Sequence, residues 1–130
     1  MKLSSLEDTF DLSKKMGKLL SSGDVIFLYG EIGVGKTTFV RGLINNLEVE
    51  KEMVESHILS PTFNIVFDYE IKKLKIMHYD LYRLKNSTDI NELGIFAEIE
   101  DHITIIEWPE LIKKKPDNRI EMLLAIQTKI

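Results

Sequence analysis

The feature that most constrains how this chain can fold is the segment from Gly30 to Thr37, which reads Gly-Glu-Ile-Gly-Val-Gly-Lys-Thr. It matches the pattern G-x-x-x-x-G-K-[ST] in full. An apolar run of strand length, Val25–Tyr29, precedes it, and a helix is predicted to follow from Lys36 to about Asn46. This context of strand, loop and helix is the one in which the pattern binds phosphate, so the segment predicts an α/β fold around a buried central strand.

Each part of this phosphate loop, residues 30–37, has an expected role in binding phosphate. The glycines allow positive φ angles and a close approach of the backbone, so that successive N–H groups form an anion-binding concavity at the positive end of the helix. Lys36 is expected to reach the β- and γ-phosphates, Thr37 to ligate Mg²⁺, and Thr38 to add an α-phosphate contact. The backbone contacts fall on Ile32, Gly33, Val34 and Gly35.

Composition narrows the kind of protein further. A chain of 130 residues that is 44 % hydrophobic and 29 % charged can bury one soluble core, so a single domain over 1–130 is expected. Acids near the N-terminus and the lack of a run of ~18 apolar residues predict a cytoplasmic protein. The chain has no cysteine, so the expected metal is a hard, oxygen-bound cation. A net charge of −4 argues against tight autonomous binding to a polyanion such as RNA.

The order of helices and strands expected along the rest of the chain predicts a three-layer α/β sandwich of the P-loop NTPase type. Its mixed, mainly parallel sheet includes an antiparallel hairpin. Glu48 to Ser60 is interpreted as loop or weak helix, because it shows no clear periodicity. The other expected elements are a helix from Ser5 to about Leu20, a hairpin with strands near 63–70 and 74–79, a helix near 86–96 that breaks at Gly94, a strand at 103–106, a short helix opened by Pro109, and a last strand at 120–126.

Missing motifs exclude several P-loop branches. The chain has neither the Asn-Lys-x-Asp of guanine recognition nor the Leu-Ser-Gly-Gly-Gln of transporter ATPases. It also lacks the additional arginines that a nucleotide kinase uses to clamp a second phosphorylated substrate. A small-metabolite kinase stays open as an alternative, as does an adaptor that senses ATP without hydrolysing it.

Three further segments carry a family resemblance: Ser60-Pro61-Thr62-Phe63, then His78-Tyr79-Asp80-Leu81-Tyr82-Arg83-Leu84, then Ile106-Glu107-Trp108-Pro109-Glu110. With the phosphate loop, their order and spacing resemble the TsaE (YjeE) family over about 8–126. The resemblance implies a weak Mg²⁺-dependent ATPase that binds ATP and ADP. It also implies a role in forming the threonylcarbamoyl group on adenosine 37 (t6A) of tRNAs that read codons beginning with adenine. The resemblance further implies that partner proteins of the TsaB and TsaD type carry out the transfer and that tRNA is reached only through them.

The strand-end carboxylates and one threonine are the further catalytic candidates. Asp80 and Glu107 follow predicted strands, where α/β sheets place ligand-binding groups, so either can complete the Mg²⁺ shell or orient the attacking water. The resemblance favours Glu107 as the metal ligand and Asp80 as the second or water-orienting group. Thr62 is the candidate switch residue that senses the γ-phosphate, against the alternative of a capped turn stiffened by Pro61.

Other positions follow from the resemblance alone. Trp108 resembles an active-site cover, with a core aromatic as the alternative. Ser5 and Thr9 are expected near adenine or ribose, although Ser5 alone would be simply a helix cap. Arg83 is either a cation for the transition state or a structural ion pair, and His78 is interpreted as a plain strand residue. The family usually continues past its last strand with a Gly-Arg pair, which these 130 residues do not contain.

Overall fold

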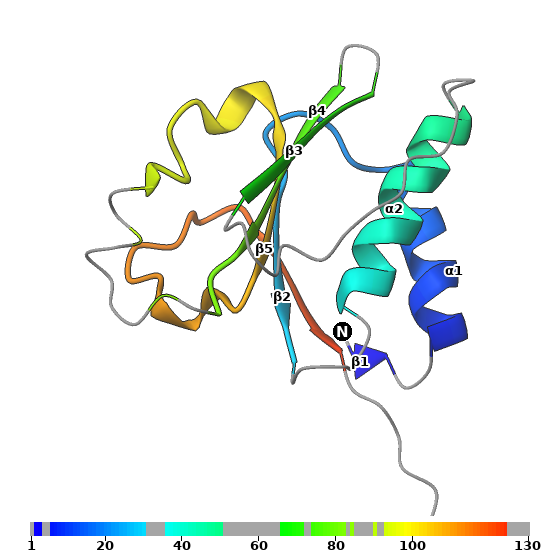
Figure 1. Ribbon diagram of the computed structural model, residues 1–130, viewed down its shortest axis with the longest axis horizontal. Helices are drawn as coiled ribbons and strands as arrows, with labels where there is room; N and C mark the ends of the chain where they lie inside the picture. Colours follow the sequence, from blue (N-terminus) through cyan, green and yellow to red (C-terminus); the bar gives the residue numbers. More distant parts are fainter. Residues whose placement is uncertain are drawn as a thin grey trace, which may run out of the picture.

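The protein is described from a computed structural model over residues 2–3, 6–30, 36–50, 66–71, 74–82, 84, 90 and 93–124. At residues 2–3, 6–10, 36, 37, 50 and 124 only the backbone is described. Figure 1 shows a twisted sheet with two α-helices on one side and an irregular segment on the other. Of the helices in these described ranges, none has the length and apolarity needed to cross a membrane.

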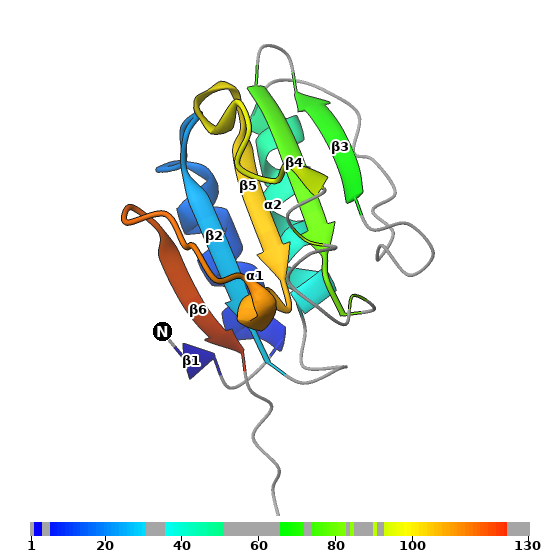
Figure 2. The ribbon, with the colours of Figure 1, turned by 90° about the vertical axis from the view of Figure 1, so that its left-hand side faces the viewer.

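A six-stranded sheet of order β1-β6-β2-β5-β4-β3 forms the centre of the fold, and Figure 2 shows the strands side by side. Five strands run parallel, and β3 pairs with β4 as an antiparallel hairpin at one edge. The apolar run that precedes the phosphate loop forms β2 in the interior of the sheet, because every one of its first four side chains can be buried. The strands are β1 (Lys2–Leu3), β2 (Val25–Tyr29), β3 (Val66–Ile71), β4 (Leu74–Asp80), β5 (Ile103–Glu107) and β6 (Ile120–Leu124).

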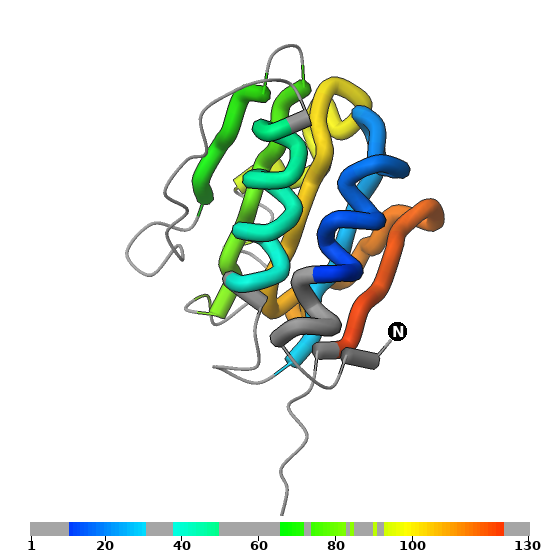
Figure 3. Tube along the Cα trace, turned by 90° about the vertical axis from the view of Figure 1, so that its right-hand side faces the viewer, coloured from blue at the N-terminus to red at the C-terminus, as the bar shows by residue number. Residues whose placement is uncertain are grey.

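Two helices, α1 (Leu6–Gly17) and α2 (Lys36–Glu50), lie side by side over one face of the sheet (Figure 3). The core beneath them includes Phe39 and Leu43 of α2 and Ile105 of β5, all fully buried. Apolar side chains recur along α2 at helical spacing, so the helix buries one continuous stripe against the strands. This packing holds the N-terminus of α2 against the sheet.

The opposite face is covered by the described residues of two segments, 84–101 and 108–112, which contain the 3₁₀ turns η1 (Ile99–Asp101) and η2 (Pro109–Leu111). Phe27, Tyr79 and Ile106 of the sheet are buried beneath these segments. Ile90 and Leu93 are helical, and the chain leaves that conformation at Gly94 with φ 60°.

The predicted fold class, the hairpin and the break at Gly94 are confirmed. The helix predicted to end at about Asn46 continues to Glu50, so the first residues of the stretch assigned to loop or weak helix are helical. The physical reason is that Leu47 is buried, so another turn of the helix still packs on the core. The two-residue β1 and the single turn η1 were not predicted, since such short elements show no periodicity.

Candidate functional site

The phosphate loop begins where the parallel strands β2, β4 and β5 reach their C-terminal ends. We call this end of the sheet the carboxyl edge. Gly30 follows β2 directly and has φ 142°, a conformation that side-chain-bearing residues rarely adopt. The helix α2 then begins at Lys36. The strand that precedes the loop and the helix that follows it therefore occupy the positions that the pattern requires.

Two carboxylates end the neighbouring strands at this edge. Asp80 is the last residue of β4, Glu107 is the last residue of β5, and the two are partners in the strand register. Glu107 is also in register with Leu28, two residues before Gly30. Paired residues of adjacent strands lie about 4.8 Å apart and point to the same face. The two acids therefore stand next to each other, close to the start of the phosphate loop.

The acids face the helical layer. Side chains alternate between the faces of a strand, and Ile103 and Ile105 of β5 belong to the core under α1 and α2. Glu107, two residues after Ile105, points to that same face, as does its partner Asp80. Because α2 begins on this face, both carboxylates are on the side of the sheet to which the phosphate loop leads.

Glu107 is buried, with 3 % of its surface exposed, and His78 of β4 contacts it. The His78 Nε2 and Glu107 Oε2 atoms are 2.6 Å apart, and His78 is fully buried. A carboxylate can only accept a hydrogen bond, so Nε2 carries the proton and donates it. Interpreting His78 as a plain strand residue missed this contact, although the Ile76–His78–Asp80 alternation indicated that all three share one face.

Asp80 is more accessible than Glu107, and its side chain shapes the turn that follows β4. Its Oδ1 accepts a hydrogen bond of 3.0 Å from the backbone N–H of Tyr82. The next backbone N–H, that of Leu81, donates to the carbonyl of Glu107 at 3.1 Å. The first bond shapes the turn after β4, and the second holds the backbone ends of β4 and β5 together.

Trp108 directly follows Glu107 and has φ 59°, a left-handed conformation that is uncommon for a bulky side chain. The conformation turns the chain out of β5 into η2, whose first residue is the buried Pro109. The rings of Trp108 and Tyr82 pack with centroids 4.9 Å apart. Tyr82 is 54 % exposed, and Trp108 also packs partly against the cluster on the face opposite the helices, so the pair lies at the end of β4 and β5 on that side.

The side chains at the carboxyl edge suit a hard divalent cation, since carboxylate and hydroxyl oxygens are the ligands that Mg²⁺ prefers. Among the described residues, no three His, Cys, Asp or Glu side chains are grouped closely enough to hold a metal ion by themselves. In nucleotide sites Mg²⁺ is commonly held by one or two carboxylates together with substrate phosphates and water.

A second polar cluster lies on the opposite face, where Tyr29 ends β2. Its hydroxyl donates to Glu121 Oε1 at 2.9 Å, and Arg119 Nε donates to the same oxygen at 3.2 Å. Burial, and then the bond to Glu121, raise the pKa of Tyr29 to about 12. The bonds from Tyr29 and Arg119 lower the pKa of Glu121. These groups satisfy one another, so the cluster is a structural one.

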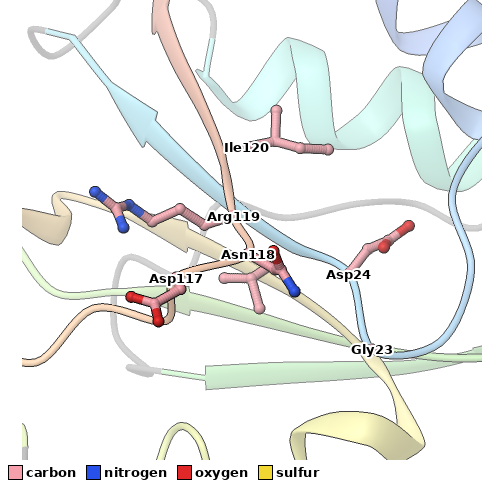
Figure 4. Close-up of a pocket in the computed structure, with 7 residues that line it drawn as sticks. Gly23, Asp24, Asp117, Asn118, Arg119 and Ile120 are labelled. Carbon is pink, nitrogen blue, oxygen red and sulfur yellow. The ribbon is translucent and has the colours of Figure 1, made fainter.

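A hollow of about 310 Å³ lies at the opposite end of the strands, the amino edge, where β2 and β6 begin (Figure 4). Two of its polar side chains, those of Asp24 and Arg119, are engaged elsewhere. Asp24 accepts a hydrogen bond from the backbone of Ser21, and Arg119 bonds to Glu121 and to the carbonyl of Pro116. In Figure 4 the guanidinium group of Arg119 extends away from Asp24. We therefore place the candidate site at the carboxyl edge.

The comparisons with known proteins decide the family. A sequence model of the family described as "Threonylcarbamoyl adenosine biosynthesis protein TsaE" matches residues 3–129. This chain belongs to the TsaE family. The expectation drawn from the four motifs is thereby confirmed.

Relatives in this family carry the name tRNA threonylcarbamoyladenosine biosynthesis protein TsaE. The chain is 39 % identical over 111 residues to the one from Rickettsia felis, which covers 85 % of this chain and 63 % of the relative. It is 41 % identical over 108 residues to the one from Aquifex aeolicus, covering 83 % and 74 % of the two chains. The chain spans only 61 % of the relative from Rickettsia conorii.

A solved structure of the same fold is that of Bacillus subtilis YdiB. The two superpose with a TM-score of 0.69 at 26 % sequence identity, over 93 % of this chain and 72 % of the other. The α/β fold with its mostly parallel sheet is thus shared with a known structure.

Of the site residues expected from the TsaE resemblance, the structure brings Asp80, Glu107 and Trp108 together at the carboxyl edge. Thr38 lies half-buried in the first turn of α2. Lys36, Thr37 and Thr9 lie in helices, with only their backbone described. The remaining candidates lie outside the described residues: Ser5, Ile32, Gly33, Val34, Gly35, Thr62 and Arg83.

Proposed function

We propose that this protein binds ATP with Mg²⁺ and hydrolyses it slowly, and that this activity supports formation of t6A on tRNA. The observation that carries the proposal is the meeting of two features at the carboxyl edge. The phosphate-binding pattern opens there after β2, and the strand-end carboxylates Asp80 and Glu107 stand beside it. A phosphate cradle next to carboxylate oxygens is the arrangement that nucleotide hydrolysis with a divalent cation requires.

In this proposal the backbone of residues 32–35 and the ammonium group of Lys36 hold the phosphates. Thr37, Glu107 and Asp80 would hold the cation, which when bound neutralises charge on the phosphate oxygens. Either Asp80 or Glu107 orients the attacking water, and Thr62 senses the γ-phosphate.

Trp108 covers the site, and Ser5 and Thr9 contact the adenosine part of the nucleotide. The cover is proposed from the family resemblance; Trp108 directly follows Glu107 and contacts Tyr82, while its side chain packs partly against the cluster on the face opposite the helices.

The proposed role in t6A formation depends on partners. The relatives are named for threonylcarbamoyladenosine biosynthesis, and the net charge of −4 does not favour direct binding of tRNA. We therefore propose that TsaB- and TsaD-type proteins carry out the transfer, and that ATP binding or hydrolysis here governs assembly or resetting of their complex. Turnover by the isolated protein should be slow, since small switch ATPases commonly need a partner to complete the site.

Two variants separate binding from hydrolysis. Lys36→Ala should lose ATP binding, while Glu107→Gln should bind ATP and lose hydrolysis, because the amide oxygen can still accept from His78 but the charge is gone. Glu110→Ala is the matched control, since Glu110 is an exposed acid three residues further along the chain. ATP binding, ADP release and t6A formation with the partner proteins are measured for each.

The outcomes discriminate between the candidate functions. Full hydrolysis by Glu107→Gln would remove Glu107 from the catalytic site, whereas a wild type that hydrolyses no ATP, alone or with the partner proteins, would sink the ATPase proposal. Full t6A formation without hydrolysis would favour the ATP-sensing adaptor. ADP release that rises with one added metabolite, in the absence of partners, would indicate a kinase. Recovery of TsaB- and TsaD-type proteins on the wild type only in the presence of ATP tests the proposed partners directly.

A further inference from the structure

We infer that His78 is a positioning residue for Glu107: its Nε2–H holds Oε2 of the carboxylate and leaves Oε1 as the oxygen available to a divalent cation. This inference rests on the proposed function, because it concerns the cation that accompanies the nucleotide. The contact that carries it is the 2.6 Å bond between two side chains that are almost completely buried.

The first argument is the restraint that this bond places on Glu107. A glutamate side chain has three rotatable bonds, and a carboxylate that must be ordered when the cation arrives loses rotamer freedom at that moment. Here the bond to His78 orders it beforehand. The imidazole is itself held in place, since its strand is paired on both sides and its ring is fully buried.

The second argument is that packing alone does not explain a histidine at this position. Nδ1 of His78 is buried and has no hydrogen-bond partner among the described residues. Burying an imidazole nitrogen without a partner is unfavourable, and an apolar side chain of similar size would avoid it. The polar interaction described for the ring is directed at Glu107, so the position of this carboxylate is what the histidine supplies.

The third argument is the register of the strands. His78 pairs with Ile105 and Asp80 pairs with Glu107, so the ring reaches diagonally along one face from β4 to the last residue of β5. The backbone bond from Leu81 to Glu107 fixes the two strand ends relative to each other. Ligating groups are commonly oriented in this way by a hydrogen-bond partner behind them, and loss of such a partner typically weakens metal affinity by about 10–100-fold.

The test compares His78→Leu, which removes the donor, with His78→Gln, whose amide nitrogen can occupy the place of Nε2. The affinity for a fluorescent ATP analogue is measured in Mg²⁺ and again in EDTA, so that no turnover is needed. In His78→Leu we expect near wild-type affinity in EDTA and an affinity gain from Mg²⁺ that is reduced about 10-fold. His78→Gln should recover most of that gain. His102→Leu is the matched control, because His102 is also buried but lies at the other end of β5.

The inference would be overturned if Mg²⁺ increased the affinity of His78→Leu for the ATP analogue as much as it does in the wild type. It would also be overturned if this increase were reduced equally in His78→Gln or in His102→Leu. If His78→Leu does not fold, His78→Gln is compared with His78→Asn, whose shorter amide cannot take the place of Nε2. Equal Mg²⁺ gains in those two variants would overturn the inference. A wild type that shows no ATP binding, or no Mg²⁺ gain, contradicts the proposed function itself, which separates the two failures.

Discussion

The two ends of the parallel strands both carry acidic side chains, but these differ in burial and in hydrogen-bond partners. At the carboxyl edge Glu107 is buried and bonded to a buried histidine. At the amino edge Asp24 bonds to a backbone N–H of its own turn, and Asp117 is exposed. The amino edge has the hollow drawn in Figure 4, yet its Asp24 and Arg119 side chains are already bonded to nearby groups of the chain. A buried, pre-oriented acid is therefore a better sign of a functional site than the size of a hollow.

The difference has a physical origin. Taking a carboxylate out of water is unfavourable unless hydrogen bonds compensate it, so a buried acid persists only where the surrounding structure provides them. Asp24 remains near water and needs little compensation. The predictions that follow test this contrast, beginning with the largest expected effect.

Glu107→Ala should lower the free energy of unfolding by about 2–3 kcal/mol, because it removes a hydrogen bond to a charged group and leaves the buried His78 donor unpaired. Asp24→Ala should lower it by less than ~1 kcal/mol, as expected for a bond near the surface. Urea denaturation at pH 7 measures both. Glu107→Gln is the control. It keeps an acceptor for His78, so its free energy of unfolding should stay close to that of the wild type. Equal losses at the two edges would contradict the comparison.

The second buried histidine tests the amino end of β5. Burial lowers the pKa of His102, and the nearby Lys75 adds to that effect. The unfolded chain then binds more protons, so stability is present above the unfolded pKa of about 6.5 and is lost as the pH falls below it. We expect His102→Leu to flatten the fall in unfolding free energy between about pH 6.5 and 5. Urea denaturation across this range gives the comparison, and parallel curves for variant and wild type would rule out the effect.

Tyr29→Phe should lower stability at pH 7 by less than ~1 kcal/mol, because the bond that it removes is partly exposed. Its effect on alkaline stability is more specific. With the folded pKa at about 12, the folded state retains its proton while the unfolded state loses it above about pH 10, so stability falls between pH 10 and 12. The variant should lose this component. Absorbance at 295 nm follows the tyrosinate, and an unchanged high-pH titration in the variant would be inconsistent with the assignment.

The smallest effect is expected for Glu121, whose side chain is exposed. Glu121→Gln should leave the unfolding midpoint at pH 7 nearly unchanged, because exposed pairs are screened by solvent. The bond from Tyr29 holds the pKa of Glu121 below its ordinary value, and Tyr29→Phe should therefore raise it. Carbon NMR of the side-chain carboxyl group measures this pKa in both proteins. An unchanged pKa would show that Tyr29 is not the main cause of the shift.

The order of the main elements was predictable because it depends on local patterns. The glycine-rich loop between an apolar run and a helix indicated β2 and α2, and the alternation at Phe67 and Tyr69 indicated the hairpin. The placement of Asp80 and Glu107 at strand ends followed from the same reasoning, and both are the last residues of their strands. The end of α2 was not predictable, because the burial of Leu47 depends on what the helix packs against.

By itself, the sequence determined the phosphate loop, the family and the two carboxylates, since each depends on residues close together in the chain. The partnership of His78 with Glu107 was decided by the tertiary structure alone. These residues are 29 positions apart, and only the parallel pairing of β4 with β5 brings a histidine of one strand against the last residue of the other. Strand register, which depends on the packing of the whole sheet, therefore decides how the carboxylate at the phosphate loop is held.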